Sequence, residues 1–224
     1  LFLRSDNGYD SNFENAEPGS WFHNTIIHEI GHVLGLAHPH HAGTQNPDYT
    51  FGVDTLVGDS LEDGNPHTVM SYATISGVGK SKSSDTTQAE TYMVNDVVAL
   101  QHLYGVNSTY AAGDNTYDYS YFTADGGSFI KSFYDAGGTD KFDFTNQYFD
   151  VSGSFAGNQF LFLDGNRSNG VVSSVTDPDI LRLSQNEGVL GISNSIIEGY
   201  LGSRGVEDIS GSDTSNFIFG GFGY

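Results

Sequence analysis

Three histidines and one glutamate stand within a single short run of this chain, HEIGHVLGLAH, which begins at His28. Residues four apart on a helix lie on one face, so His28 and His32 can direct their imidazoles at one metal ion, with Glu29 beside it. Gly35 can adopt a left-handed conformation, end the helix and return His38 to the ion as a third nitrogen ligand. Three protein ligands leave a coordination position open for water, so the run predicts a catalytic zinc site with Glu29 as general base.

The alternative interpretation of this run is a surface helix that carries histidines by accident. A bare H-E-x-x-H is expected by chance in well under ~1% of chains of this length, and the spaced glycine and third histidine lower that expectation further. The zinc interpretation is therefore favoured. The remaining histidines are interpreted as surface or helix-end residues rather than ligands: His23, His40, His41, His67 and His102.

A second motif, TVMSY, ends at Tyr72. Methionine is a polarizable side chain that fills gaps, and Met70 lies downstream of the three histidines, which fits a hydrophobic floor beneath the metal. The alternative is an ordinary core methionine. Tyr72, two residues later, is placed to bring its phenolic oxygen onto or near the zinc.

These motifs together resemble those of the serralysins, the bacterial calcium-stabilised branch of the metzincin zinc endopeptidases. Pro39 directly after the third histidine and Tyr72 after Met70 match the serralysin pattern. Astacins carry Glu after the third histidine and rely on disulfides, whereas this chain has Pro39 and no cysteine, and matrixins lack the tyrosine. The resemblance runs from about Pro18 to the C-terminus.

Two further segments extend the resemblance beyond the metal motif. Residues 95–105, NDVVALQHLYG, resemble the helix that closes a serralysin catalytic domain. Residues 135–144, DAGGTDKFDF, resemble the opening of the calcium-binding β domain that follows it. The resemblance implies an α+β fold class in two parts. Residues 1–106 form the C-terminal part of a metzincin-like catalytic domain, and residues 107–224 form an all-β sandwich or β-roll-like domain with degenerate repeats.

The chain departs from the family at both ends. A serralysin catalytic domain places a twisted sheet and a long helix before the zinc helix, but few residues precede His28 here. Residues 1–4 are interpreted as the last, edge strand of that sheet. Residues 222–224 lack the acidic-then-apolar terminus of a type I secretion signal. We therefore expect a chain truncated upstream and downstream.

A calcium site is predicted where Asp135 and Asp140 flank Gly137 and Gly138. Calcium takes six to eight oxygen ligands, and glycines let backbone carbonyls approach between two carboxylates. A solvated acidic turn is the alternative. By the resemblance, backbone oxygens around three residues complete this site, namely Ala111, Gly113 and Asn115.

The resemblance also implies a second calcium site at Gly205 and Glu207. Glu198 competes with Glu207 for that role, and the choice depends on one gap in the alignment. The implied cofactors are thus one catalytic Zn²⁺ and one or more structural Ca²⁺ ions.

Composition fits a secreted protein that uses calcium. The 8 basic and 28 acidic residues give a net charge of −20, which repels nucleic acid and anionic membranes. The absence of cysteine excludes a disulfide framework. No apolar run approaches the ~20 residues that span a bilayer, and no signal peptide opens the chain. We expect a soluble, extracellular monomer with protein or peptide substrates.

Hydrophobic periodicity places the remaining elements. Asn24 or Thr25 can cap a helix that runs to Leu34, and apolar residues recur at helical spacing from Met93 to the stop at Gly105. Residues 39–90 are mostly loop and are expected to line the cleft. Short strands are expected in seven later runs, at residues 128–134, 141–144, 159–163, 170–175, 188–192, 195–200 and 216–221.

The predicted activity is that of a zinc endopeptidase. Glu29 takes a proton from water, which attacks the peptide carbon, and passes it to the leaving amine. Tyr72 is both a candidate zinc ligand at rest and a candidate donor to the tetrahedral oxyanion. Two alternatives stay open, a non-catalytic zinc- and calcium-binding structural or adhesion fragment and a metal hydrolase acting on another bond.

Overall fold

The computed structural model describes ten stretches of the chain, which are residues 16–39, 67–71, 88–122, 129–147, 150–154, 159–164, 188–193, 195–205, 207–211 and 214–221. Several predictions fall outside these stretches. They are the role of Tyr72, the edge strand at residues 1–4, the strand at 170–175, most of the loop at 39–90 and the character of residues 222–224.

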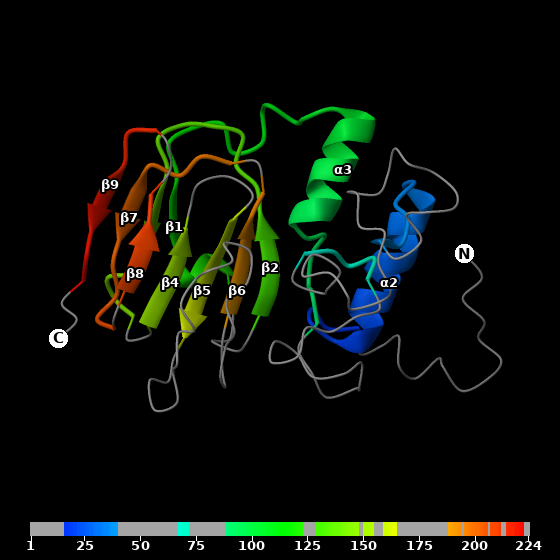
Figure 1. The fold of residues 1–224 in the computed structure, drawn as a ribbon, viewed down its shortest axis with the longest axis horizontal. Coiled ribbons are helices and arrows are strands. Elements are labelled where there is room, and N and C mark those ends of the chain that lie inside the picture. The colour runs from blue at the N-terminus through cyan, green and yellow to red at the C-terminus, as the bar shows by residue number, and fades with distance from the viewer. Residues whose placement is uncertain are drawn as a thin grey trace.

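Two helices lie side by side at one end of the molecule (Figure 1). Helix α2 spans Trp21–Val33 and carries the first two histidines of the motif. Its N-cap is Ser20, whose Oγ accepts a hydrogen bond from His23 N at 3.1 Å. The prediction that Asn24 or Thr25 caps this helix is therefore wrong, because the helix begins a turn earlier. The Asn24 amide instead donates to the carbonyl of Ala89 at 3.2 Å.

Helix α3 spans Val94–Tyr104, between Met93 and Gly105, which confirms the predicted closing helix and its glycine stop. Gly105 takes a positive φ of +86°, a conformation that favours glycine. The Tyr104 hydroxyl donates to the carbonyl of Leu34 at 2.9 Å, which ties the end of α3 to the end of α2. Both helices pack on one buried cluster: Leu36, Val69, Met70, Ala89, Met93, Val94, Ala99 and Ile130.

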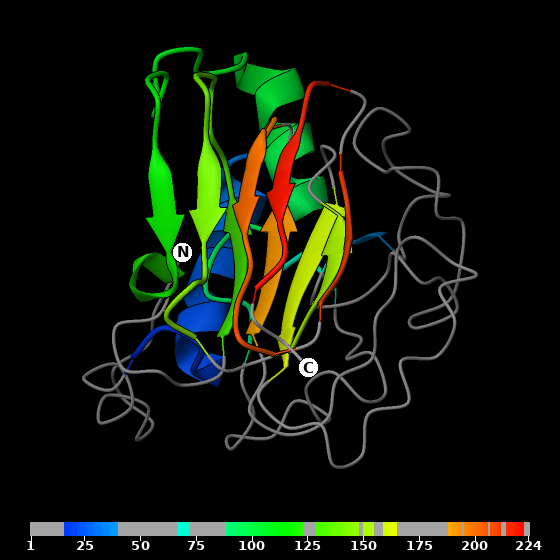
Figure 2. The ribbon, with the colours of Figure 1, turned by 90° about the vertical axis from the view of Figure 1, so that its left-hand side faces the viewer.

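The rest of the described chain forms two sheets and the short helix α4 at Tyr119–Phe122. One sheet is entirely parallel, in the order β1 (Thr116–Asp118), β3 (Lys141–Asp143), β7 (Gly199–Leu201) and β9 (Phe217–Phe219). Figure 2 shows these four strands side by side, from green to red. The other is mixed, in the order β2 (Phe129–Phe133), β6 (Gly188–Ile192), β5 (Gln159–Asp164), β4 (Asp150–Ser154) and β8 (Glu207–Ser210).

Six of the seven predicted strand runs contain a strand in the structure, namely β2, β3, β5, β6, β7 and β9. Three further strands, β1, β4 and β8, were not expected from the sequence. β1 has three residues only, and β4 and β8 carry glycine, serine and acidic residues where strand periodicity asks for apolar ones, so tertiary pairing decides them.

The two sheets share one apolar core, dominated by aromatic rings. It is formed by Tyr117, Phe129, Phe133, Phe142, Phe144, Leu190, Ile192, Ile197 and Tyr200. Members of both sheets meet in it: Tyr117 of β1 and Phe133 of β2 pack edge to face, with ring centroids 4.5 Å apart. The chain crosses between the sheets at each step from β1 to β4 and from β6 to β9, whereas β4, β5 and β6 follow one another in the mixed sheet.

The helical part meets the sheets at strand β2, through residues 89–91. Ala89 and Ile130 form a parallel bridge, and Glu90 N donates to the Ile130 carbonyl at 2.8 Å. Ser132 N donates to Thr91 Oγ1 at 2.7 Å. Lys131 and Glu90 form an ion pair at 3.1 Å. These contacts fix the helices relative to the sheets.

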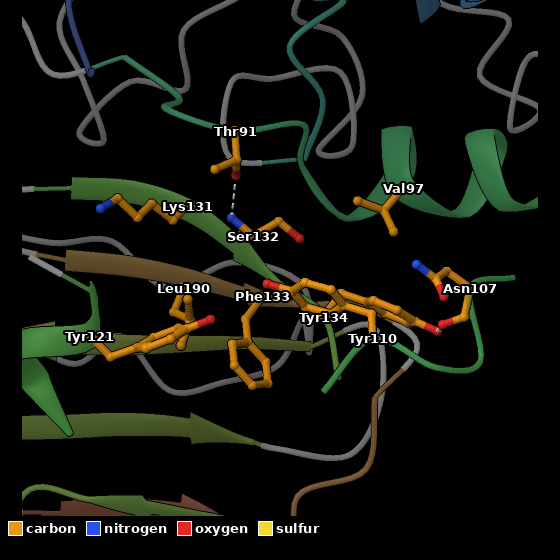
Figure 3. A pocket seen from close by; sticks show the side chains of 10 residues that line it. All are labelled: Thr91, Val97, Asn107, Tyr110, Tyr121, Lys131, Ser132, Phe133, Tyr134 and Leu190. Atoms are coloured by element: carbon orange, nitrogen blue, oxygen red, sulfur yellow. Dashed lines mark hydrogen bonds between the residues drawn. The ribbon is translucent and has the colours of Figure 1, made fainter. Parts of the chain in front are cut away.

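A cavity of about 520 Å³ opens beside this junction (Figure 3). Its lining includes Val97 of α3, three tyrosines and residues of β2. The ring of Tyr110 stacks on that of Tyr134, with centroids 6.1 Å apart. None of the three motif histidines lines this cavity. Among the described residues, no helix has the length and apolar character needed to cross a membrane.

Candidate metal centre

The histidine motif folds back on itself at the end of α2. His28 and His32 project from the same face of the helix, and Gly35 follows with a φ of +97°. Gly35 N donates to the carbonyl of His32 at 3.1 Å, which closes the turn. The chain then reverses and returns His38 to the first two histidines, as the spacing predicts.

The three imidazoles converge through the same ring nitrogen. His38 Nε2 lies 3.0 Å from His28 Nε2 and 3.1 Å from His32 Nε2. The ligand atoms of all three residues lie within 4.8 Å of one another, and within the described part of the chain this is the one group of its kind. Three imidazole nitrogens at such separations form a site that a metal ion could occupy.

The opposite ring nitrogens show which way the lone pairs point. His28 Nδ1 lies 2.8 Å from the Val69 carbonyl oxygen, and His32 Nδ1 lies 2.9 Å from that of Leu36. A carbonyl oxygen only accepts, so both Nδ1 atoms carry the proton and both Nε2 atoms present lone pairs. Lone pairs that face one another fit a cation between them, as in metal sites where a carbonyl orients each ligand. The donor set therefore fits zinc.

Met70 lies against the helix between its two histidines. Its side chain is buried, and a Cβ added at Gly31 would lie 2.6 Å from Met70 Sδ. The methionine therefore needs a glycine at this point of the helix. Sequence reasoning had singled out Gly35 and missed Gly31, which occupies one of the two unspecified positions of H-E-x-x-H.

Asp96 is a second residue that sequence reasoning missed. Its buried carboxylate accepts hydrogen bonds from Thr68 Oγ1 at 2.6 Å, from Val69 N at 2.8 Å and from Met93 N at 2.9 Å. Burial raises the pKa of Asp96 to about 6, although the three hydrogen bonds act to lower it. The only sequence signal was an acidic residue in the first turn of a helix. The carboxylate thus fastens the turn that carries Met70 to helix α3.

Glu29 and Tyr72 are predicted to take part in catalysis, and the structure describes only the first of them. Glu29 follows His28 on α2 and is half-buried, and its carboxylate forms no hydrogen bond or ion pair with the other described residues. Its side chain is therefore available near the histidines. Tyr72 lies one residue past the described turn at 67–71, so its role stays a prediction.

The other histidines are not part of the centre. His23 Nε2 contacts the Glu90 carbonyl oxygen at 2.8 Å, and His102 is exposed in the last turn of α3, as expected of a helix-end histidine. The expectation of a surface position is wrong for His67, which is 4% exposed because it lies in the turn beneath the helix. His40 and His41 fall outside the described residues.

A second group of possible ligands gathers at the loop between β2 and β3. Asp135 and Asp140 are both buried, and Asp140 is 1% exposed. Asp135 accepts hydrogen bonds from the Tyr117 hydroxyl and from Gly137 N. Asp140 Oδ1 accepts one from Asn115 N at 2.8 Å, whereas Asp140 Oδ2 has no donor among the described residues. A buried carboxylate oxygen without a donor is costly unless a cation neutralises it.

The segment at residues 111–115 closes over this loop, as the resemblance implies. Gly137 and Gly138 have φ values of +141° and +142°, and a Cβ on Gly138 would lie 2.5 Å from the Gly113 carbonyl oxygen. Asn115 Nδ2 donates to the carbonyls of Ala111 and Gly113. The structure therefore brings six other predicted residues together with Asp140, namely Ala111, Gly113, Asn115, Asp135, Gly137 and Gly138.

Carboxylates dominate the electrostatics of this loop. Burial first, and then the nearby Asp135 and Glu198 carboxylates, raise the pKa of Asp140 to about 6. Burial and the hydrogen bond to Asp135 also raise the pKa of the Tyr117 hydroxyl. The acidic groups of Asp135, Asp140 and Glu198 therefore favour either protonation of Asp140 or the binding of a cation beside it.

Glu198 also belongs to this group, whereas the second calcium site predicted at Gly205 and Glu207 stays a prediction. Glu198 Oε2 accepts from Asp140 N at 2.7 Å. The Glu207 carboxylate instead accepts from Ser203 N and Gly221 N, and Gly205 N donates to Ser203 Oγ. Among the described residues, Gly205 and Glu207 make no contact with Asp135 or Asp140. Pairing across the parallel sheet decides this, because β3 and β7 are neighbours and Glu198 directly precedes β7.

Comparison with known proteins points to metallopeptidases. Residues 4–103 match the metallo-peptidase family M12B, reprolysin-like. The chain is 32% identical to serralysin of Proteus mirabilis over 224 residues, which cover 96% of this chain and 40% of that protein. It is 30% identical to metallopeptidase AprA of Pseudomonas marginalis over 229 residues, covering 96% and 42%. Serralysin C of Dickeya chrysanthemi is 37% identical over 145 residues, covering 60% and 29%. The chain therefore spans well under half the length of these relatives.

Proposed function

This chain belongs to the serralysin-like metallopeptidases, and we propose that it is the metal-binding part of a secreted zinc endopeptidase that hydrolyses peptide bonds in proteins. The convergence of three imidazole Nε2 atoms carries the proposal. The Nδ1 atoms of His28 and His32 face backbone carbonyls, which orients both rings with Nε2 toward the site.

The chain's own residues have distinct roles in this reaction. Zinc, when bound by the three histidines, supplies a Lewis acid that acidifies water and polarises a carbonyl. Glu29, beside His28, accepts the proton of the attacking water and delivers it to the nitrogen of the leaving amine. Tyr72 donates a hydrogen bond to the oxyanion that forms at the scissile carbonyl.

The second half of the chain, residues 107–224, is proposed to be a calcium-stabilised β-roll-like domain, and residues 1–106 the peptidase part. The crossing of the chain between the two sheets from β1 to β4 and from β6 to β9, and the all-parallel order β1-β3-β7-β9, support a roll. Asp140 Oδ2, which has no donor among the described residues, supports an ion at the Asp135–Asp140 loop. Asp135, Asp140 and the carbonyls of the 111–115 segment would bind it, together with Glu198, whose carboxylate accepts from Asp140 N.

The test uses the full chain with zinc restored and casein as the substrate. We expect one zinc per chain and casein cleavage that a zinc chelator abolishes and added zinc recovers. Glu29→Gln should keep the zinc and lose at least ~10³-fold in kcat/KM, because it removes the base and none of the ligands. A matched control is Glu17→Gln, an exposed charge ahead of α2, which should retain activity.

Two results would contradict the proposal. A wild-type chain that binds no zinc would remove the metal chemistry altogether. Zinc-loaded Glu29→Gln with wild-type turnover would show that Glu29 is not the base. A chain that binds zinc and calcium but never cleaves a peptide would support the alternative, a non-catalytic metal-binding fragment.

A further inference from the structure

We propose that Asp96 is a positioning residue for His28, acting through the hydroxyl of Thr68 and the peptide between Val69 and Met70. The inference rests on the proposed function, since it assigns a role toward the metal to residues that do not touch it. It concerns α3, a helix that contributes none of the proposed ligands.

An unbroken series of hydrogen bonds connects the two residues. His28 Nδ1 donates to the Val69 carbonyl oxygen at 2.8 Å. The nitrogen of the same peptide, Met70 N, donates to Thr68 Oγ1 at 3.0 Å. The Thr68 hydroxyl in turn donates to Asp96 Oδ1 at 2.6 Å. Both ends of one peptide group are therefore held, one by the histidine and the other by the hydroxyl.

Every bond in this series points the same way. Each donor faces toward Asp96, so the negative charge of the carboxylate polarises the hydroxyl, then the peptide, and then the imidazole. The effect at His28 is to raise the electron density at Nε2, the atom proposed to bind the metal. A carboxylate behind a ligating histidine has the same effect in many metal sites, where it raises the basicity of the ligand and fixes its ring.

The other oxygen of Asp96 fixes the geometry of the series. Asp96 Oδ2 accepts from Val69 N at 2.8 Å and from Met93 N at 2.9 Å. These bonds hold the residue that supplies the acceptor of His28 to the start of α3. The carboxylate is 3% exposed, so water does not compete for it.

His32 provides an internal contrast. Its Nδ1 faces the carbonyl of Leu36, four residues further along its own chain segment. The orientation of His32 is thus local to the end of α2, whereas that of His28 depends on the turn at 68–70 and on α3. Changes at Asp96 or Thr68 should therefore act on one ligand.

The experiment measures zinc affinity by competition with a chromogenic chelator, and the absorption spectrum of the cobalt-substituted protein. Thr68→Val replaces the hydroxyl by a methyl group of similar shape and interrupts the series, and Thr68→Ser restores it. Asp96→Asn keeps the shape of the side chain and removes its charge. We expect Thr68→Val and Asp96→Asn to weaken zinc binding by ~10- to 100-fold and to shift the cobalt bands. Thr68→Ser should match the wild type.

Destabilisation is controlled with Phe144→Leu, in the core between the sheets, which should lower the melting temperature and leave zinc affinity unchanged. Wild-type zinc affinity and cobalt spectra in both folded Thr68→Val and Asp96→Asn would overturn the inference, while the proposed function would stand. Failure of the wild type to bind zinc would instead remove the proposed function. If Asp96→Asn does not fold, Thr68→Val and Thr68→Ser decide the question.

Discussion

The histidine centre and the Asp135–Asp140 loop are both candidate metal sites, but they hold their ligands by opposite means. Imidazole carries no charge when it binds a metal, and the Nδ1 atoms of His28 and His32 donate to backbone carbonyls. The loop gathers carboxylates, with Asp135, Asp140 and Glu198 around one buried position and one oxygen left without a donor among the described residues. Neutral ligands can be assembled before the ion arrives, whereas clustered carboxylates repel one another until it does.

This difference separates the effects of the two ions. Loss of zinc should abolish the chemistry and change the fold little, because protein groups already orient the ligands. Loss of calcium should weaken the fold, because the carboxylates lose their countercharge. A chain with a net charge of −20 has few cations of its own to substitute.

After the loss expected for Glu29→Gln, the largest effect is on rate, at Tyr72. Tyr72→Phe deletes one oxygen and keeps the ring. If the hydroxyl donates to the oxyanion, kcat should fall by ~10- to 10³-fold with little change in KM or zinc content. Steady-state kinetics with metal analysis measure this. An unchanged kcat would leave Tyr72 with a packing role only.

The next largest effect is on stability, at the carboxylate loop. Millimolar calcium at a ~10 μM site should stabilise the fold by about 2.7 kcal/mol and raise the melting temperature by a few degrees. Asp140→Ala should remove this response, and magnesium should not reproduce it. Melting curves with calcium titrated in give the answer, with Asp118→Ala as an exposed acidic control. Identical calcium responses in wild type and Asp140→Ala would make the loop a solvated turn.

A third effect concerns pH in the absence of calcium. The pKa of Asp140 is raised to about 6 in the fold, above its ordinary value of 3.8, so between these values the folded state holds a proton that the unfolded state releases. Its contribution to stability is therefore present at low pH and lost as pH rises through about 4 to 6. Asp140→Asn should flatten this part of the melting profile.

Asp96 provides a comparison for the pH response of Asp140. Its pKa is also raised to about 6, but its oxygens accept hydrogen bonds from Thr68, Val69 and Met93. Added calcium should reverse the pH response of Asp140, since the ion favours the ionised carboxylate. It should leave that of Asp96 unchanged. Equal calcium sensitivity of the two profiles, measured with Asp96→Asn and Asp140→Asn, would contradict the distinction.

The smallest expected effect tests the packing beneath the histidines. Gly31→Ala would place a Cβ 2.6 Å from Met70 Sδ, the far end of a flexible side chain. We expect a loss of about 1 kcal/mol in the free energy of unfolding, since the methionine can shift. Chemical denaturation measures it, with Gly105→Ala as a comparison in which backbone strain and not contact is the cause. A wild-type stability for Gly31→Ala would show that Met70 moves freely.

Local signals in the sequence were sufficient for some features. The ligand spacing of His28, His32 and His38, the left-handed turn at Gly35 and the helix that ends at Gly105 depend on short-range geometry, and the structure has them where predicted. The N-cap at Ser20 was missed because Asn24 and Thr25 offered equally good capping side chains.

Other features depend on contacts between distant parts of the chain. The position of Glu198 beside Asp140 follows from the pairing of β3 with β7, and strands β1, β4 and β8 exist because neighbours pair with them. Burial of His67 follows in the same way from the packing of residues 67–71 beneath α2.

The sequence by itself determined which atoms can bind a metal, because ligand type and helical spacing are local properties of the chain. Only the tertiary structure decided which residues orient the ligands and which residues pack against the helix that carries them. Asp96 reaches the turn at 68–70 across 27 residues of chain, and Gly31 accommodates Met70 from another segment. A hydrogen bond or a close contact across such a separation leaves no periodic pattern, since packing alone brings the partners together.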